Sequence, residues 1–201
     1  MNRTKINIII ILCLLICSCQ SDSTDYKDFQ FGKYNMKIKI PKEFKSANEE
    51  EIKKFYDFGR KNIEENGYQS GNQNNILFLN KGEFSSIKVK YSLQDAENLK
   101  DYKNQWESLK KMTFDILTKE KIPEATIDST SRKENINGIN FYVFEKNINF
   151  LDDNKNMANF KFLRYSTPLE EMEFVINVKY ANRVDEKDLL ATIRSIKINK
   201  K

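Results

Sequence analysis

The sequence predicts an α+β fold in which an antiparallel β-sheet is flanked by helices. Segments of alternating apolar and polar residues recur along the chain, bounded by short turns that contain Gly, Asn or Asp. Between them lie stretches whose apolar residues recur at helical spacing. Short turns join antiparallel strands, whereas parallel strands need crossovers of a dozen or more residues. Residues 29–201 are therefore expected to form a single domain.

The first expected elements are a hairpin and a helix. Residues 34–40 alternate apolar and polar side chains and end at Pro41, and a Gly-Lys turn lets them pair with residues 28–31. Residues 46–49, Ser-Ala-Asn-Glu, match a capping box. A helix is expected to begin there and to end near residue 66, where an Asn-Gly pair follows.

A second hairpin and a long helix come next. Strands are expected over 76–80 and 85–92, joined by a Lys-Gly turn. Ser92-Leu-Gln-Asp95 matches a second helix cap, and the amphipathic helix that follows stops before Pro123. Trp106 belongs to the apolar stripe of this helix, so we expect it to pack in the core rather than to stack on a ligand.

The C-terminal half is predicted to be mostly strand. Four strands are expected, near residues 126–134, 139–150, 157–167 and 173–181. Asn137-Gly138 is the strongest hairpin signal among the turns between them. A last helix over 185–195 and a short apolar tail at Ile196 and Ile198 close the chain.

The N-terminal residues have the composition of an export signal. A short cationic start precedes an apolar run from Ile8 to Cys17 that is too short to span a bilayer, and a small residue stands before Cys19. The run Ile16-Cys17-Ser18-Cys19 resembles the lipobox of bacterial lipoproteins. That resemblance implies removal of residues 1–18 and acylation of Cys19, including palmitate on its sulfur. An ordinary cleaved signal peptide is the alternative.

The residues after the cysteine are polar and acidic. Residues 19–28 are expected to form a flexible tether because they offer nothing to bury. Gln20, Asp22 and Asp25 resemble the surface-export signal of Bacteroidota lipoproteins. The resemblance implies a lipoprotein of the cell envelope, held at the outer membrane by its acyl chains, and leaves a periplasmic and a surface-exposed position both open.

Short motifs of the domain resemble the PsbP-like fold. They are Ile40-Pro-Lys-Glu-Phe44 after a strand, Ile136-Asn-Gly138 between long strands, a strand over 174–180, and Ile193-Arg-Ser-Ile196 in the closing helix. The resemblance covers most of residues 29–198 and implies an α/β/α sandwich. It carries no catalytic residues over to this chain, because the family has none in common.

The composition excludes many kinds of active site. The chain has no histidine, and its three cysteines all fall within residues 13–19. His-dependent catalysis and the usual zinc sites are thereby excluded, and we expect no catalytic residue, metal or cofactor. Removing residues 1–18 takes away Arg3 and Lys5 and no acid, so the net charge falls from +5 to +3. That balance does not predict a nucleic-acid partner.

Lysines on two of the expected strands are the first candidates for a binding site. Lys37 and Lys39 lie on one strand and Lys88 and Lys90 on another, and they would share a face if these strands pair. Such a cluster suits phosphate, an acidic glycan or a lipid headgroup. A solvated surface that prevents edge-to-edge aggregation is the alternative interpretation.

Two polar loops are further candidates. Tyr68 lies in a polar loop with two glycines, a setting that suits a binding loop or a plain connection. Residues 152–156 alternate oxygen ligands as a calcium loop does, but Met157 and Leu163 stand where such a loop needs Gly and Glu. We therefore expect a hairpin turn there.

Together these observations predict a lipid-anchored envelope protein that acts as a non-catalytic binding or accessory module. The membrane would hold the acyl chains, and a protein or glycan of the envelope would be the partner. An immunity-type lipoprotein that occludes a toxin is one alternative. A carboxylate-based hydrolase is the other, and it requires a buried acidic pair lining a cleft.

Overall fold

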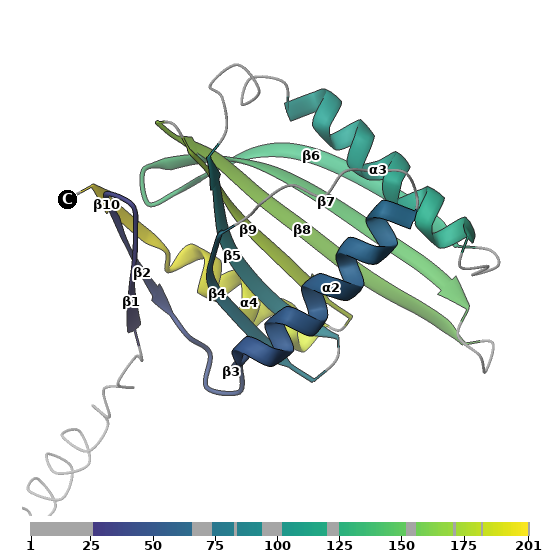
Figure 1. The fold of residues 1–201 in the computed structure, drawn as a ribbon, viewed down its shortest axis with the longest axis horizontal. Coiled ribbons are helices and arrows are strands. Elements are labelled where there is room, and N and C mark those ends of the chain that lie inside the picture. The colour runs from purple at the N-terminus through teal and green to yellow at the C-terminus, as the bar shows by residue number, and fades with distance from the viewer. Residues whose placement is uncertain are drawn as a thin grey trace, which may run out of the picture.

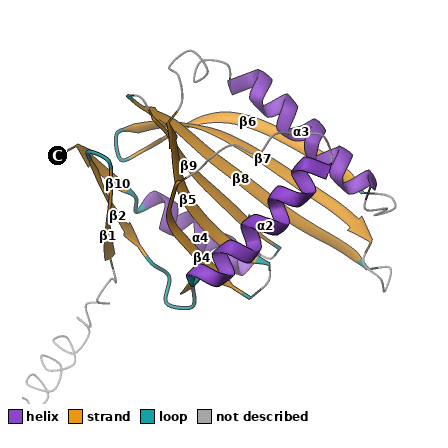
Figure 2. Ribbon diagram, viewed as in Figure 1, coloured by secondary structure: helices purple, strands orange, loops and turns teal. Residues whose placement is uncertain are grey.

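The computed structural model describes residues 26–65, 74–82, 84–93, 102–119, 125–151, 156–170, 172–181 and 183–200. They form two antiparallel sheets and three helices (Figures 1 and 2). The small sheet has the order β1-β2-β10, with β1 at Tyr26–Phe31, β2 at Tyr34–Lys39 and β10 at Lys197–Lys200.

The large sheet has seven strands in the order β3-β4-β5-β9-β8-β7-β6, and every neighbouring pair is antiparallel. Its strands are β3 (Lys45–Ser46), β4 (Asn74–Lys81), β5 (Ser85–Leu93), β6 (Thr126–Ile136), β7 (Ile139–Leu151), β8 (Met157–Leu169) and β9 (Met172–Tyr180). The antiparallel α+β class expected from the sequence is confirmed.

Helices cover both faces of the large sheet. The long helices α2 (Glu49–Glu65) and α3 (Tyr102–Lys119) lie across one face, which we call the α2/α3 face (Figure 1). The other face packs against β1, β2 and α4 (Arg183–Arg194), and we call it the core face. No helix in the described part of the chain is both long and apolar enough to cross a bilayer.

The core face holds the main hydrophobic core. Because side chains alternate along a strand, β5 turns Ile87 and Val89 to this face, and β9 turns Phe174, Ile176 and Val178 to it. All five side chains are buried. The small sheet and α4 supply the other half of the core through residues that include Met36, Ile38, Leu189 and Ile193.

The turn at Asn137-Gly138 forms as expected and has a second role. Both residues have positive φ, 49° and 86°, as the tight hairpin between β6 and β7 requires. The Asn137 side-chain amide donates to the carbonyl oxygens of Arg194 and Ile196 at 2.9 and 2.7 Å. The turn therefore holds the end of α4 in place.

Three expectations about element ends are corrected. The capping box that begins α2 uses Asn48 and Glu51, whose side chains each accept a hydrogen bond from the other residue's backbone N–H at 2.9 Å. Ser46 lies in β3 instead. Ser92 does not cap a helix either, because β5 continues through it and the described part of α3 begins at Tyr102. The apolar tail forms β10, paired with β2.

Candidate functional site

Five positively charged side chains gather on the α2/α3 face of the large sheet. Where β5 turns Ile87 and Val89 to the core, it turns the residues between them the other way. The same alternation on β7, β8 and β9 brings cations from four strands to one face. We call this set the basic cluster: Lys88, Lys90, Lys146, Arg164 and Lys179.

The strand register places these residues as neighbours. One row across the sheet runs Phe78, Lys88, Asn177, Arg164, Phe144 from β4 to β7. The next row runs Ser86, Lys179, Phe162, Lys146 from β5 to β7. Because neighbouring strands lie about 4.8 Å apart, all the backbone positions of the basic cluster fall within about 15 Å across the sheet.

One carboxylate lies within the basic cluster. Glu173 of β9 is 1% exposed and is the single acid that the described strands place on the α2/α3 face. Its Oε1 accepts a hydrogen bond from the Arg164 guanidinium at 3.0 Å, and Arg164 also donates to Ser166 Oγ at 3.1 Å. The pair fixes the position of the Arg164 side chain. On the described strands, Glu173 is thus the one carboxylate of this face beside the five cations of the basic cluster.

The surroundings of the lysines shift their protonation. Burial, with repulsion from Lys179, lowers the pKa of Lys88 to about 7. Burial, with repulsion from Arg164 and Lys88, lowers the pKa of Lys90 to about 7 although Glu173 opposes this. Burial and Arg164 lower the pKa of Lys146 to about 8. Each of these ammonium groups would be favoured by a nearby negative charge, so the cluster is suited to an anion.

Aromatic rings and helix α3 border the basic cluster. The Lys88 ammonium lies over the Phe78 ring at 4.7 Å, and the Lys146 ammonium over the Phe162 ring at 5.6 Å. Lys146 also donates to Thr113 Oγ1 of α3 at 2.6 Å. Trp106 of α3 is half-buried and stacks on Phe144 at 5.7 Å, so it packs against the sheet at the edge of the interior. On the helices above the cluster, Asp115 of α3 is half-buried, whereas Glu50, Glu51, Asp57 and Glu64 of α2 are exposed.

Two further carboxylates, Glu145 and Glu186, link strands of the large sheet to one another and to α4. On the core face, Glu145 pairs with Arg132 at 3.0 Å and with Lys161 at 3.4 Å. Lys161 also pairs with Glu186, which accepts a hydrogen bond from Tyr180 at 2.7 Å. Each carboxylate is therefore engaged with a positive charge that neutralises it. No group of three or more potential metal ligands occurs among the residues described.

Asp185 joins the β4–β5 hairpin to the start of α4. This buried carboxylate accepts hydrogen bonds from Lys81 at 2.8 Å and from Ser85. The pKa of Lys81 is raised by its bonds to Asp185 and Glu43. An acid in the first turn also stabilises the helix N-terminus. These contacts explain Asp185 as a structural residue.

A cleft of about 540 Å³ lies between α3 and the start of β6. It is lined by Glu107, Lys110, Lys111, Ala125, Thr126 and Ile127. Among the described lining residues Glu107 is the single carboxylate, so these residues do not supply the acidic pair that a carboxylate-based hydrolase requires. Its two lysines, Lys110 and Lys111, belong to α3.

The four lysines selected from the sequence do not share a face. Lys37 and Lys39 are exposed on β2 of the small sheet, whereas Lys88 and Lys90 are half-buried on β5 of the large sheet. The condition for a shared face is not met, because β2 pairs with β1 and β10, and β5 with β4 and β9. Anion binding by Lys88 and Lys90 stays a prediction.

Sequence analysis did not single out Lys146, Arg164 and Lys179. Each occupies an alternating position of a strand that the sequence predicts, but their common face depends on the hairpin registers of β7, β8 and β9. Three other predicted features lie outside the described residues. They are Cys19, Tyr68 and the residues of the 152–156 loop up to 155.

Comparison with solved structures supports the fold. The cyanobacterial PsbP protein (CyanoP) of Synechocystis is 12% identical, with a TM-score of 0.51 over 90% of this chain and 98% of that one. A protein from Bacteroides thetaiotaomicron is 8% identical over 83% of this chain and 46% of that one, with a TM-score of 0.44. LpqN of Mycobacterium tuberculosis, involved in cell envelope biogenesis, is 8% identical over 87% and 91%, with a TM-score of 0.41.

No protein-family model matches this sequence, and no curated protein sequence matches it. The similarity to CyanoP extends over nearly the whole of both chains and shows a common α+β fold of the PsbP-like type. At 12% identity it shows the fold alone.

Proposed function

We propose that this protein is a lipid-anchored module of the bacterial cell envelope that binds an anionic ligand at its basic cluster and performs no catalysis. The observation that carries this proposal is the basic cluster itself. The five cations of the basic cluster lie close together on one face of the sheet with Glu173 among them, and burial lowers the pKa of three of these cations. Like charges that are buried close together repel one another, and a ligand of opposite charge would relieve that repulsion.

The anchor is proposed at Cys19. The cationic start, the short apolar run and the Ser-Cys pair favour acylation of this residue, with palmitate on its sulfur and attachment to the outer membrane. Several acyl chains at one residue would hold the protein permanently, because each buried methylene contributes about 0.8 kcal/mol. The acidic residues that follow support a tether between the lipid and β1, which begins at Tyr26.

A binding role is favoured over catalysis by the state of the acidic groups. Glu145, Glu173 and Asp185 each contact a cation, and these contacts link strands to one another or to α4. A general acid needs a carboxyl that stays protonated near neutral pH, and a neighbouring cation works against that. The chain also lacks histidine, the commonest general base.

Anion binding is tested with inorganic phosphate as the probe. The full chain is reconstituted into vesicles of neutral phosphatidylcholine, where Trp106 is the single tryptophan. Trp106 stacks on Phe144, whose neighbour in the register is Arg164, so its fluorescence reports on the basic cluster. We expect a saturable change with phosphate. Lys90→Gln should weaken the affinity about tenfold, the equivalent of about 1.4 kcal/mol.

The matched control is Lys37→Gln, which removes an exposed lysine of the small sheet. It should bind phosphate as the unaltered chain does. The absence of a saturable response, or an equal loss in both variants, would contradict a specific site at the basic cluster.

The anchor is tested by cell fractionation and mass spectrometry. Cys19→Ala should move the protein from the membrane fraction to the soluble fraction, and the unaltered protein should begin at an acylated Cys19. Membrane association that persists in Cys19→Ala, or a free thiol at Cys19 in the mature protein, would disprove the lipoprotein assignment.

A further inference from the structure

The α2/α3 face changes from charged to apolar along its strands. Beyond the two rows that hold Lys88, Arg164, Lys179 and Lys146, the next row contains Phe160 and its partners Ile148 and Ile127. The row after that contains Phe150, paired with Ala158. The apolar rows therefore begin directly beside the basic cluster, on the same strands.

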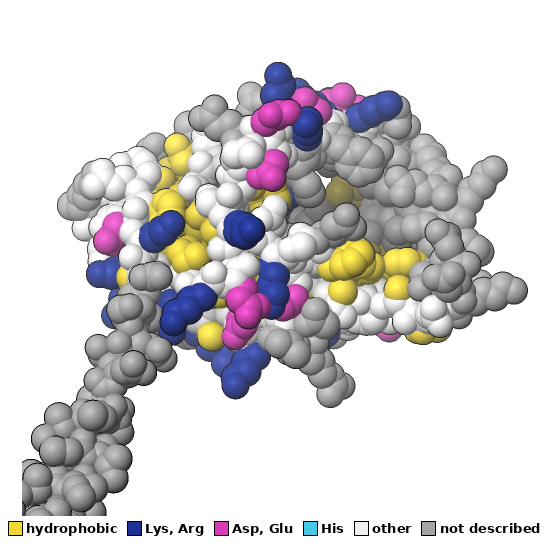
Figure 3. Space-filling view, turned by 90° about the horizontal axis from the view of Figure 1, so that it is seen from below, with side chains coloured by type: hydrophobic (Ala, Val, Ile, Leu, Met, Phe, Trp, Pro, Cys, Tyr) yellow, Lys and Arg dark blue, Asp and Glu magenta, His cyan; other side chains and the backbone are white. Residues whose placement is uncertain are grey.

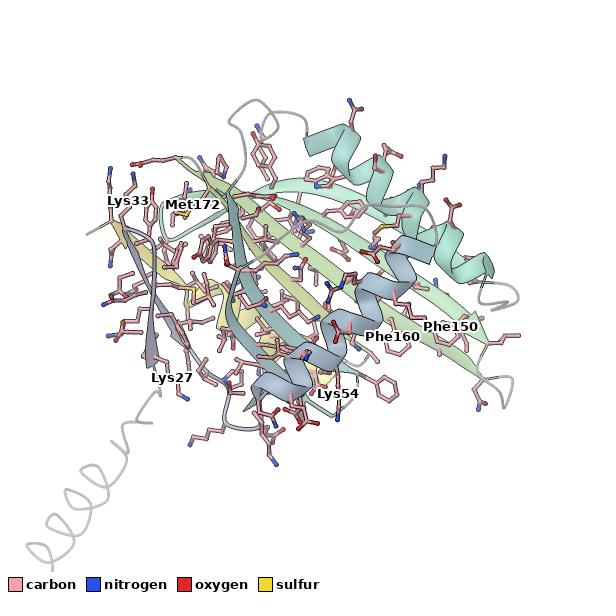
Figure 4. The ribbon with its side chains drawn as sticks, in the orientation of Figure 1. Lys27, Lys33, Lys54, Phe150, Phe160 and Met172 are labelled. Atoms are coloured by element: carbon pink, nitrogen blue, oxygen red, sulfur yellow. The ribbon has the colours of Figure 1, made fainter. Side chains whose placement is uncertain are left out.

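Three aromatic rings form the end of this face, and we call them the aromatic end: Phe84, Phe150 and Phe160. Phe150 and Phe160 stack with ring centroids 5.6 Å apart and planes at 8°, and Figure 4 shows them together beyond α2. Phe84 of the β4–β5 turn adds a third ring 5.4 Å from Phe160.

The aromatic end reaches the protein surface. Phe84 is 53% exposed, and Phe150 and Phe160 are half-buried. Hydrophobic side chains are also visible at the surface in the view from below (Figure 3). The exposed Phe84 ring continues into two stacked, half-buried rings, so the apolar area is larger than that of a single exposed side chain, and such an area is typical of a binding surface.

The basic cluster and the apolar rows lie close enough together for one ligand to contact both. Arg164 and Phe160 are four residues apart on β8, which places their backbones about 13 Å apart along the strand. A small inorganic anion would occupy the basic cluster and leave the aromatic end in water. A molecule with a negative head and an apolar chain would cover both.

A single molecule fits this surface better than a bilayer does. Lys88, Lys90 and Lys146 are half-buried between the sheet and the helices, and Lys146 is bonded to Thr113 of α3. Headgroups in a flat membrane contact cations that are exposed at a protein surface, and they do not reach cations that lie between two layers of a fold. A free molecule can place its head between the layers.

We propose that the ligand of the basic cluster is an anionic single-chain amphiphile, whose acidic head lies among Lys88, Lys90, Lys146 and Arg164 and whose alkyl chain lies along the aromatic end. This inference rests on the proposed anion-binding function and adds the class of the ligand. The head carries phosphate or carboxylate, and the chain contacts Phe160, Phe150 and Phe84.

Dodecyl phosphate is the probe, compared with inorganic phosphate and with dodecanol. Each is titrated, below its micelle concentration, into the full chain in phosphatidylcholine vesicles, and Trp106 fluorescence is recorded. Empty vesicles give the amount of probe lost to the bilayer. We expect dodecyl phosphate to bind at least tenfold more tightly than inorganic phosphate, since each buried methylene strengthens binding about fourfold, or about 0.8 kcal/mol. Dodecanol should bind at least tenfold more weakly than dodecyl phosphate.

Two variants separate the head from the chain. Lys90→Gln should weaken the binding of both phosphates. Phe160→Ser should weaken dodecyl phosphate about tenfold and leave inorganic phosphate unchanged. Tyr26→Ser, which removes an exposed aromatic ring of β1, is the matched control and should change neither affinity.

Each contrary outcome has a distinct meaning. If both phosphates bind with equal affinity, the amphiphile proposal fails and the anion-binding function stands. If neither phosphate binds, both proposals fail. If vesicles that contain anionic phosphatidylglycerol change Trp106 fluorescence as dodecyl phosphate does, the site binds a membrane surface and the amphiphile proposal is wrong.

Discussion

The two faces of the large sheet are made by the same strands and differ in chemistry. On β5 and β9 the core face carries Ile87, Val89 and Phe174, all buried among apolar neighbours. The α2/α3 face of these strands carries Lys88, Lys90 and Lys179. The core face accounts for the stability of the fold. The α2/α3 face contains charged groups at a cost in stability, and such groups are typical of a functional surface.

The largest expected effect is on the core face. Phe174 is fully buried and stacks on Phe31 at 5.3 Å. Phe174→Ala should lower the free energy of unfolding by about 3–5 kcal/mol, as is typical when a buried phenylalanine leaves a cavity. Urea denaturation measures it. If Phe162→Ala on the α2/α3 face costs as much, the two faces do not divide stability as we infer.

The next effect concerns the single carboxylate of the basic cluster. Glu173→Gln leaves Arg164 without its counterion and should destabilise the fold by about 3 kcal/mol, since breaking a buried pair costs about 3–5 kcal/mol. The double variant Glu173→Gln with Arg164→Met should recover most of this loss. Thermal unfolding of the three chains checks the prediction. If Glu173→Gln is as stable as the double variant, the unpaired charge of Arg164 does not lower the stability.

A smaller effect of opposite sign is expected at the lysines. Lys90→Met removes a charge whose burial is unfavourable and should raise the free energy of unfolding by about 1 kcal/mol, because burial of an ionised group is costly. The same change should weaken phosphate binding. Thermal unfolding and the Trp106 titration measure the two effects. A variant that is less stable yet binds phosphate normally would identify Lys90 as a structural residue.

The last effect is on the pH dependence of stability. Lys88 and Lys90 have a pKa of about 7 in the folded chain and about 10.5 when unfolded, so between these values the unfolded chain binds more protons. The free energy of unfolding therefore rises with pH in this window. Linkage gives about 2 kcal/mol for each lysine from pH 7 to pH 9, so the melting temperature should increase by about ten degrees, since about 1 kcal/mol shifts it by about 2–4 °C.

The control for the pH prediction is the double variant Lys88→Met with Lys90→Met, in which most of the rise should disappear. The window ends below pH 10, because burial and Glu186 raise the pKa of Tyr180, which opposes the trend at higher pH. A melting temperature that falls steadily from pH 7 to pH 9 would contradict the lowered pKa of the lysines.

Most of the fold was predictable from local patterns. The strands from β4 to β9 follow alternating residues and turn dipeptides, and the Asn137-Gly138 turn has the positive φ angles that its sequence predicts. The errors occurred where two local signals compete. Residues 46–49 and Asn48 to Glu51 both match a capping box, and the side-chain contacts of the second decide the helix start.

The candidate site was predictable only in part. Lys88 and Lys90 were identified because they alternate with apolar residues on one strand. Lys37 and Lys39 do not share a face with them, because β2 and β5 belong to different sheets, and local patterns do not tell which strands become neighbours. The chain crosses from β5 to β9 only after the whole of α3, β6, β7 and β8.

The sequence by itself determined which elements form, which side of each strand is apolar, and that no histidine takes part in any site of this protein. Alternation and turn chemistry act over a few residues, so they can be seen in one dimension. The tertiary structure decided that Arg164, Lys146 and Lys179 join the lysines of β5, beside the stacked rings of Phe150 and Phe160. That meeting depends on strand order and register, which long-range packing sets.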